Sequence, residues 1–323
     1  MAALVEANDG PALAYGEDPW SAAATDAIRE LFGAPVEVLL CWGGTGANVA
    51  GLASVLHPWQ AVLTPDTAHI VVDECGAPAR FTGATVVPVP HVDGKLVPDA
   101  LGPWLEWSGA VHHPQPRVIS ISQCTEMGTV YSAEEIAAIC DLAHRHGLVV
   151  HVDGARIANA VAASGADVRS MLLEPGVDLM TFGFTKNGAM YGEALVHLDP
   201  ELAANARFVH KQAAQLPSKA RYVAAQVTAL LTDDLWLRNA SRANEMAALL
   251  TERLRDIDGV VLDVPVESNA VFPRLPDSSI EVLREWTFFW PWDPAESRVR
   301  WMTSFATTED DVERFVAGVR RAV

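Results

Sequence analysis

Cysteine, basic residues and long apolar runs are all scarce in this sequence, and each scarcity excludes a class of protein. The four cysteines lie far apart with no C-x-x-C pair, at Cys41, Cys75, Cys124 and Cys140. This spacing argues against a disulfide framework or a zinc site and favours reduced thiols in a cytoplasmic protein. No apolar segment reaches the ~20 residues that a membrane helix requires, and residues 1–10 contain no basic stretch followed by an apolar run. We therefore expect neither secretion nor membrane insertion.

The charge balance points to a small-molecule partner. Asp plus Glu number 41 against 23 Lys plus Arg, which gives a formal net charge of -18. This charge disfavours non-specific attraction to nucleic acid or anionic lipid, and we expect neither as a partner. Half of the 323 residues are hydrophobic, enough for a substantial core that we expect to divide into one large and one small domain.

Strand-length apolar runs alternate with helical patterns in the first part of the chain. The clearest runs are residues 36–42, 117–122 and 148–152, and a capping-box pattern at residues 132–135 opens the helix between the last two. Short buried strands separated by helices predict an α/β fold, with a mostly parallel sheet covered on both faces.

The pattern changes after about Asp199. We expect helices over residues 221–231 and 239–255, short strands near Val260, Asn269 and Arg298, and a last helix from Thr307. This predicts a large domain over residues 1–238 and a small α+β domain over 239–323. The aromatic stretch 286–292 indicates either a binding surface or a piece of core or subunit interface.

A glycine-rich turn, Gly43-Gly-Thr-Gly-Ala-Asn48, follows the first predicted strand. Glycines let backbone amides approach an anion, and a helix N-terminus favours negative charge, so the turn suits a phosphate. A plain strand-to-helix turn explains it equally well. The segment is neither a P-loop nor a Rossmann fingerprint, because the Lys-Ser/Thr pair and the required spacing are missing.

Asp153 stands at the carboxyl end of the buried strand 148–152, where α/β folds form their ligand crevices. A carboxylate there needs a cation. The pyridinium nitrogen of pyridoxal phosphate (PLP) would be one, and an aspartate against it keeps the ring protonated. The alternative role is an N-cap for the next helix.

Lys186 is the only cation in a polar turn that follows the apolar stretch 178–184. An exposed lysine is ordinarily a solvated charge, but a desolvated one near another cation has a lowered pKa and can form a Schiff base. A phosphate turn, a strand-end aspartate and a lysine after the next strand, in this order, are more specific together than any one of them. They indicate a PLP enzyme.

The sequence resembles the low-specificity L-threonine aldolases, within the β-eliminating lyase group of fold-type I PLP enzymes. Similar segments occur in the family's order at residues 15–19, 44–48, 68–76, 151–156, 184–188 and 300–303. The Asp-Gly-Ala-Arg and Thr-Lys-Asn-Gly stretches are the most specific. The resemblance implies a fold-type I transferase-like architecture, with a mostly parallel seven-stranded sheet in the large domain and a small C-terminal α+β domain.

The resemblance also implies how the cofactor is held. Lys186 would carry PLP as a Schiff base, with Thr185 beside it, and Asp153 would pair with the pyridine nitrogen. His69 would stack on the ring, although a purely structural histidine is the alternative there. Gly44 and Thr45 would hold the phosphate.

Substrate and partner contacts follow from the same resemblance. Arg156, which would also contact the cofactor, and Arg300 would clamp the substrate carboxylate, a task that suits the guanidinium fork. Tyr15 looks like the family residue that lies near the neighbouring subunit's cofactor. We therefore expect a homodimer or homotetramer with shared active sites.

Three segments depart from the family pattern. Glu126 stands where many members have a histidine, so a carboxylate or a water would handle the substrate's β-hydroxyl group. Residues 215–221 replace a glycine-rich stretch with an arginine, leaving Lys219 and Arg221 as sources of charge. The chain opens in a helix at Met1 without the family's extended segment: either the start lies upstream or the protein works without it.

The leading functional hypothesis is retro-aldol cleavage of a β-hydroxy-α-amino acid, such as threonine or allo-threonine, to glycine and an aldehyde. Lys186, His69 and Glu126 are the expected catalytic residues, and no metal is expected. One alternative is another PLP reaction, β-elimination or transamination, because only the surroundings of Cβ differ. The other is a PLP-binding homologue without turnover.

Overall fold

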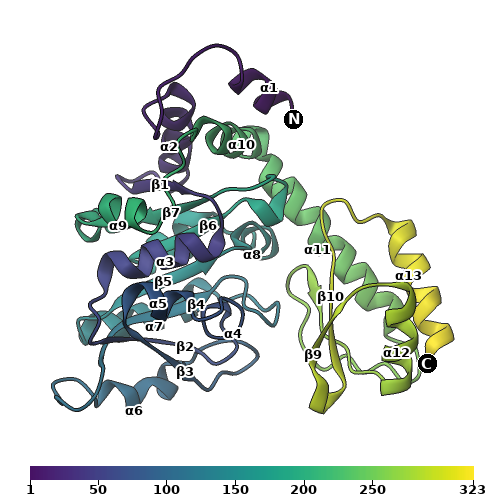
Figure 1. Cartoon of the computed structure of the whole chain (residues 1–323). Coiled ribbons are helices and arrows are strands. Elements are labelled where there is room, and N and C mark those ends of the chain that lie inside the picture. The colour runs from purple at the N-terminus through teal and green to yellow at the C-terminus, as the bar shows by residue number, and fades with distance from the viewer.

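The computed structural model describes all residues, Met1–Val323, and its larger part is built on a seven-stranded sheet (Figure 1). The strand order is β1-β7-β6-β5-β4-β2-β3, and only β7 runs antiparallel to its neighbours. The strands are β1 (Glu37–Cys41), β2 (Gln60–Pro65), β3 (Thr85–Val89), β4 (Gln115–Ser122), β5 (Val149–Gly154), β6 (Leu179–Gly183) and β7 (Glu193–His197). The prediction of a mostly parallel seven-stranded sheet is therefore confirmed.

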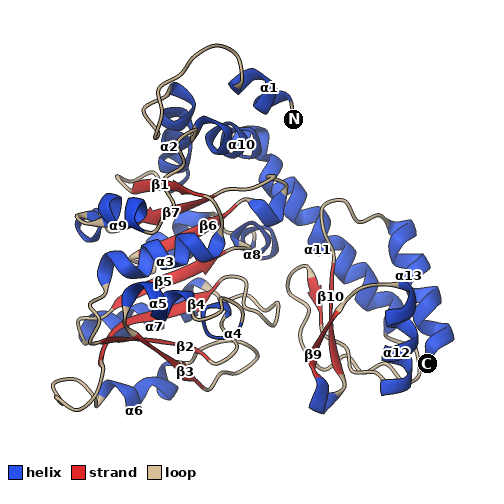
Figure 2. Ribbon diagram, viewed as in Figure 1, coloured by secondary structure: helices blue, strands red, loops and turns tan.

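Helices surround this sheet (Figure 2). They are α1 (Ala2–Ala7), α2 (Pro19–Phe32), α3 (Gly44–Val55), α4 (His69–Val72), α5 (Ala77–Thr82), α6 (Gly102–Leu105), α7 (Ala133–Arg145), α8 (Ile157–Ser164), α9 (Ala206–Gln212) and α10 (Arg221–Leu231). The capping box predicted for α7 is present, since Ser132 and Glu135 each accept the other's backbone N–H.

Both faces of the sheet are buried, because neighbouring residues of one strand enter different hydrophobic clusters. One cluster lies under α3 and contains Val62, Val118, Val149 and Leu179. The other includes α2, α7 and α8 and contains the next residue of each strand, Leu63, Ile119, Val150 and Met180. This two-sided burial explains why the strands appear in the sequence as continuous apolar runs.

The C-terminal part contains α11 (Leu235–Leu254), α12 (Asp277–Trp286), α13 (Glu309–Ala322) and an antiparallel sheet in the order β8-β10-β9. The strands of this sheet are β8 (Ala270–Val271), β9 (Trp290–Asp293) and β10 (Arg298–Met302), and Figure 1 shows β9 and β10 on the side facing the larger sheet. Aliphatic residues of α11, β10 and α13, with Trp301, form its separate core. The boundary proposed after residue 238 would fall inside α11, whose Ala240 belongs to the larger core and Met246 to the smaller.

Several local predictions need correction. The strand expected near Val260 is only a single bridge between Val261 and Arg274. The aromatic stretch, by contrast, overlaps a strand that was not predicted, β9, whose Trp290 and Pro291 pair with β10. The last helix begins at Glu309, with Thr308 rather than Thr307 as its N-cap. None of the helices is both long enough and apolar enough to cross a membrane.

Candidate active site

The predicted site residues gather at one edge of the larger sheet. Asp153 lies at the carboxyl end of β5, Lys186 follows β6, and Glu126 follows β4. His69 opens α4, a few residues after β2, and the glycine-rich turn follows β1. Because parallel strands end at the same edge of a sheet, their loops meet in one crevice.

A chain of hydrogen bonds joins two of these residues through two others. The amide nitrogen of Asn48 donates to Asp153 Oδ2 over 2.8 Å and to Glu74 Oε1 over 2.9 Å. Glu74 Oε1 also lies 2.9 Å from His69 Nδ1. Thr181 fixes the orientation of Asn48 by donating to its amide oxygen over 2.7 Å.

This network influences the charge states of Asp153 and His69. Burial alone would raise the pKa of Asp153, but the Lys186 charge and hydrogen bonds from Asn48 and Ala155 outweigh it, and the pKa is lowered. The hydrogen bond to Glu74 raises the pKa of His69 against the opposing effect of burial. The crevice therefore presents an ionised aspartate and a basic histidine.

The alternative role of Asp153 as a helix N-cap is wrong. Its Oδ1 accepts the Ala155 amide over 2.9 Å, whereas α8 begins at Ile157 with Arg156 at the N-cap position. The carboxylate therefore closes a local turn and keeps its other oxygen for Asn48.

Lys186 is held in a single turn of 3₁₀-helix, Thr185–Asn187. The Thr185 hydroxyl donates to Gly192 O over 3.2 Å, and the Asn187 amide donates to Trp236 O over 2.8 Å. The Lys186 side chain is exposed over part of its surface. Surrounding protein nevertheless desolvates its amine and, together with the Arg156 charge, lowers its pKa, which favours the neutral nucleophilic form.

The glycine-rich turn leads into α3 without a side-chain cap. Its N-cap is Gly43 and the helix begins at Gly44, so the first amides have no capping partner. A Cβ atom added at either glycine would meet nothing within 4 Å, whereas one at Gly46 would lie 2.1 Å from Cδ of Gln215. Gln215 therefore packs against this turn, and its Oε1 accepts the Trp42 amide over 3.2 Å.

Of the two basic residues in the departing segment 215–221, Arg221 is engaged elsewhere. Its guanidinium donates to Gly10 O and lies over the Trp20 ring. Gln215 is therefore the residue by which this segment contacts the glycine-rich turn, and this contact could not be predicted from the sequence.

Glu126 lies on the loop between β4 and α7, against His69. Its Oε1 accepts the His69 backbone amide over 2.9 Å and the Ser122 hydroxyl over 2.6 Å. Its Oε2 is buried with no hydrogen-bond partner. Burial raises the pKa of this carboxyl group, and the nearby charge of Asp153 acts in the same direction. An unpartnered oxygen of raised basicity is suited to take a proton.

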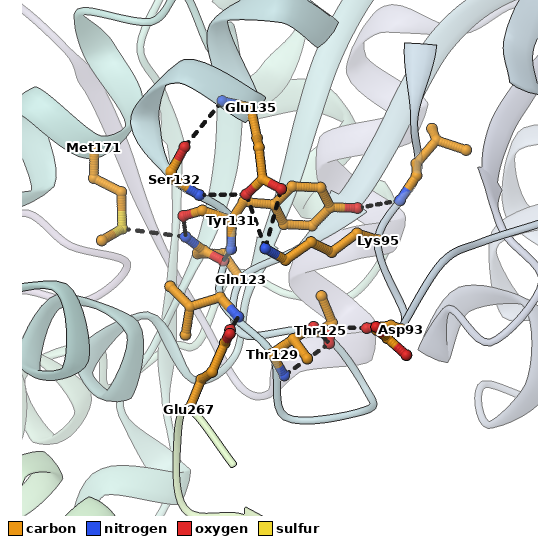
Figure 3. A network of polar contacts seen from close by, with 12 residues as sticks. Asp93, Lys95, Gln123, Thr125, Thr129, Tyr131, Ser132, Glu135, Met171 and Glu267 are labelled. Carbon is orange, nitrogen blue, oxygen red and sulfur yellow. Dashed lines mark hydrogen bonds and ion pairs between the residues drawn. The ribbon is translucent and has the colours of Figure 1, made fainter. Parts of the chain in front are cut away.

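The loop that contains Glu126 is held by polar contacts of the residues before and after it in the sequence, which Figure 3 shows. Gln123 and Tyr131 pair through two hydrogen bonds, of 2.9 and 3.0 Å, that join side chain to backbone. The Thr125 and Thr129 hydroxyls lie 2.7 Å apart. Glu267, from the C-terminal part, accepts the Val130 amide over 2.6 Å and ties the loop to that part.

Two arginines supply positive charge at the same crevice. Arg300 on β10 lies over the Trp292 ring at 5.2 Å, and its Nε is buried without a partner. Burial and the neighbouring Arg156 charge lower the pKa of Arg300. Two nearby guanidinium groups, one with an unsatisfied donor, are suited to a carboxylate. His69, Arg300, Trp290 and Trp292 line a cavity of about 570 Å³ beside them.

Tyr15 lies apart from these residues. The residue is 51% exposed, and the Lys211 ammonium lies 4.6 Å from the centre of its ring. Together with Arg29 and Arg207 it lines a separate cavity of about 560 Å³. Tyr15 is therefore not a core residue of its own chain.

Sequence reasoning missed three residues of this crevice. Asn48 and Glu74 lay inside the segments that carried the resemblance, but nothing in the sequence indicated that they bond to each other. Glu193 begins β7 as a single charge in an apolar strand. Because a buried charge needs a partner, this single acid in an apolar strand was the signal that could have identified Glu193 as a site residue.

Comparisons with known proteins agree with this geometry. The family model described as beta-eliminating lyase matches residues 1–276. A low-specificity L-threonine aldolase of Pseudomonas aeruginosa is 39% identical over 322 residues, covering 99% of this chain and 92% of the relative. Its counterpart from a Pseudomonas species is 39% identical over 313 residues, covering 93% and 90%.

The solved structures extend the likeness to three dimensions. The threonine aldolase structure of Leishmania major has a TM-score of 0.92 at 32% identity, covering 98% of this chain and 94% of that one. A putative L-allo-threonine aldolase of Listeria monocytogenes has a TM-score of 0.74 at 18% identity, covering 100% and 93%. This second match supports the fold alone.

Proposed function

Because the chain belongs to the β-eliminating lyase family and, within it, to the low-specificity L-threonine aldolases, we propose that it cleaves a β-hydroxy-α-amino acid such as threonine or allo-threonine to glycine and an aldehyde. The protein is a lyase that depends on PLP. The observation that carries the proposal is the hydrogen-bonded chain from Asp153 through Asn48 and Glu74 to His69, beside Lys186.

The residues of the crevice fit PLP. Asp153, buried and ionised, would hold the pyridine nitrogen in its protonated form. The uncapped start of α3 at Gly44 and Thr45 offers amides to a phosphate. Lys186 would bind the cofactor covalently, with Thr185 beside it, and the His69 ring would cover the cofactor ring. When bound, PLP supplies a ring that withdraws the electron pair left on the substrate Cα.

The remaining polar groups would orient the substrate and move its proton. Arg156 and Arg300 would hold the carboxylate, which fixes the Cα–Cβ bond in the orientation for cleavage. Glu126 Oε2 would take the β-hydroxyl proton, since its burial makes the carboxylate a stronger base. Two contacts hold His69 in place. Its ring bonds to Glu74, which raises its pKa, and its backbone amide donates to Glu126.

The protein is further proposed to be a cytoplasmic homo-oligomer, a dimer or a tetramer. All four cysteines are free thiols, which supports a reducing compartment. Large apolar side chains such as Trp42, Met190 and Phe208 are exposed, and together with Tyr15 they support a subunit interface. Tyr15 would then reach the neighbouring subunit's cofactor.

The test is a spectrum and a product analysis of the purified protein loaded with PLP. We expect a visible absorbance band that changes when glycine is added, and glycine plus aldehyde from threonine or allo-threonine. Lys186→Ala should remove the band, whereas Lys211→Ala and Lys219→Ala should keep it. Ammonia with a keto acid would instead indicate β-elimination, and a band without any product would indicate a binding protein. Borohydride labelling of Lys211 or Lys219 would refute the assignment of Lys186.

A further inference from the structure

Glu193 is a buried acid that the proposed reaction does not use. It begins β7, is 5% exposed, and pairs in register with Gly183 on β6 and with Cys41 on β1. Its Oε2 accepts the Phe184 backbone amide over 2.6 Å. A carboxylate is costly to bury, and the amide that this one accepts belongs to Phe184, two residues before Lys186, so its place calls for a functional explanation.

The residue before Glu193 holds the same turn. Gly192 O accepts the Thr185 hydroxyl over 3.2 Å. Gly192 has a φ of +120°, and a Cβ atom there would lie 2.6 Å from Val223. The start of β7 thus fixes the two residues that precede Lys186, while the Asn187 amide fixes the residue that follows it.

We propose that Glu193 is a positioning residue for Lys186, whose carboxylate fixes the backbone of the lysine turn and acts as the local counter-charge of the lysine nitrogen. The inference rests on the proposed function, in which Lys186 binds PLP. It gives the buried acid two tasks, one geometric and one electrostatic, and the two can be separated by substitution.

The charges around Glu193 support the electrostatic task. Burial raises the pKa of Glu193 to about 7, against the hydrogen bond from Phe184, the nearby Thr185 and the charge of Lys186. In return, the Glu193 charge raises the pKa of Lys186. The other group facing it is Cys41 on β1, whose pKa is raised to about 12 mainly by burial, so that it stays a neutral thiol near pH 7.

Lys186 has three further charged neighbours. Arg156 lowers its pKa, and Asp153 and Glu126 raise it. If PLP occupies the crevice, Asp153 would pair with its pyridine nitrogen, whereas Glu193 would keep its contact with the lysine turn through Phe184. Its ionisation near neutral pH would therefore determine how readily the lysine nitrogen keeps a proton.

The decisive experiment compares Glu193→Gln with the PLP-loaded wild type by titrating the visible absorbance against pH. Glutamine keeps the shape and an oxygen for the Phe184 amide but removes the charge. We expect the midpoint to fall by about one pH unit, the scale for loss of one nearby carboxylate. Glu37→Gln is the matched control, because Glu37 belongs to β1 and pairs with His197 at the far end of β7; its midpoint should equal that of the wild type.

Glu193→Asp tests the geometric task, since it keeps the charge on a shorter side chain. We expect a near-normal midpoint with slower uptake of PLP by the apoprotein and a lower melting temperature. Equal midpoints for Glu193→Gln, Glu37→Gln and wild type would overturn the electrostatic role, and normal PLP uptake by Glu193→Asp would overturn the geometric one. A wild type without an absorbance band, or with a band that survives Lys186→Ala, would instead refute the proposed function.

Discussion

The side-chain amide of Asn48 donates to the carboxylate of Asp153 over 2.8 Å, although 105 residues separate them in the sequence. Asn48 belongs to the first turns of α3, and Asp153 ends β5. The helix that begins at the glycine-rich turn therefore also carries the group that holds the aspartate. One strand-turn-helix unit would serve both ends of the cofactor, the phosphate and the pyridine nitrogen.

Replacing Asn48 should weaken the site without removing any group that touches substrate. In Asn48→Ala, Asp153 loses a charge-assisted hydrogen bond, and Glu74 is left with one donor fewer. We expect a 10- to 100-fold loss of kcat/KM, corresponding to about 1.5–3 kcal/mol for a hydrogen bond to a charged group. Thr181→Val removes the donor to the Asn48 amide oxygen but leaves both bonds that Asn48 donates, so it should show a smaller loss in the same assay. Equal activity of Asn48→Ala and wild type would mean that Asp153 does not need this donor.

Asp153→Asn should keep the cofactor and lose the reaction. Asparagine fills the same volume but has no charge with which to keep a ring nitrogen protonated. We expect PLP absorbance to remain and kcat to fall by about 100-fold or more, the scale of losing one electrostatic contact that stabilises the transition state. Spectrum and rate should be measured on one sample, and a rate near that of wild type would show that the Asp153 charge has no part in turnover.

The helices and strands could be predicted from the sequence where the local preference of a segment agrees with its place in the folded protein. The capping box at Ser132 and the apolar runs of β4 and β5 specify their elements locally, and the family-like segments predict Lys186 and Asp153 as residues of the cofactor site. The contacts of Glu74, Gln215 and Glu193 could not be predicted, because each joins segments that meet only in the folded sheet. Strand β9 was missed for a related reason: a strand near Arg298 was predicted, but the pairing of Trp290 and Pro291 with it forms only in the folded small domain.

Two buried histidines should make the fold sensitive to acid. Burial lowers the pKa values of His151 and His197 to about 4, and each ring has one nitrogen without a partner. The unfolded chain titrates near pH 6.5 and binds these protons first, so stability is full above about pH 6.5 and falls as the pH drops toward 4. We expect a loss of about 2–3 kcal/mol for each histidine over this range.

Urea denaturation at several pH values measures this loss. His151→Gln and His197→Gln remove the titrating ring and should flatten the dependence between pH 6.5 and 4, whereas His57→Gln, at an exposed ring stacked on Trp59, should not. An unchanged slope in both buried variants would assign the acid sensitivity to other groups.

Mixing two inactive variants should restore part of the activity if the active site is shared between subunits. Tyr15 is exposed and lies apart from the residues around Lys186 in its own chain, which is what a residue reaching a neighbour's cofactor requires. Lys186→Ala would remove the covalent link to PLP, and Tyr15→Ala would remove the contact from the neighbour. In an equal mixture that exchanges freely, half of the dimers are hybrids and one of their two sites has both residues intact, so about one quarter of the wild-type activity should return. Size-exclusion chromatography of differently tagged chains establishes that exchange has occurred. If exchanged subunits regain no activity, each site is built from a single chain, and Tyr15 then has its role within its own cavity beside Arg29 and Arg207.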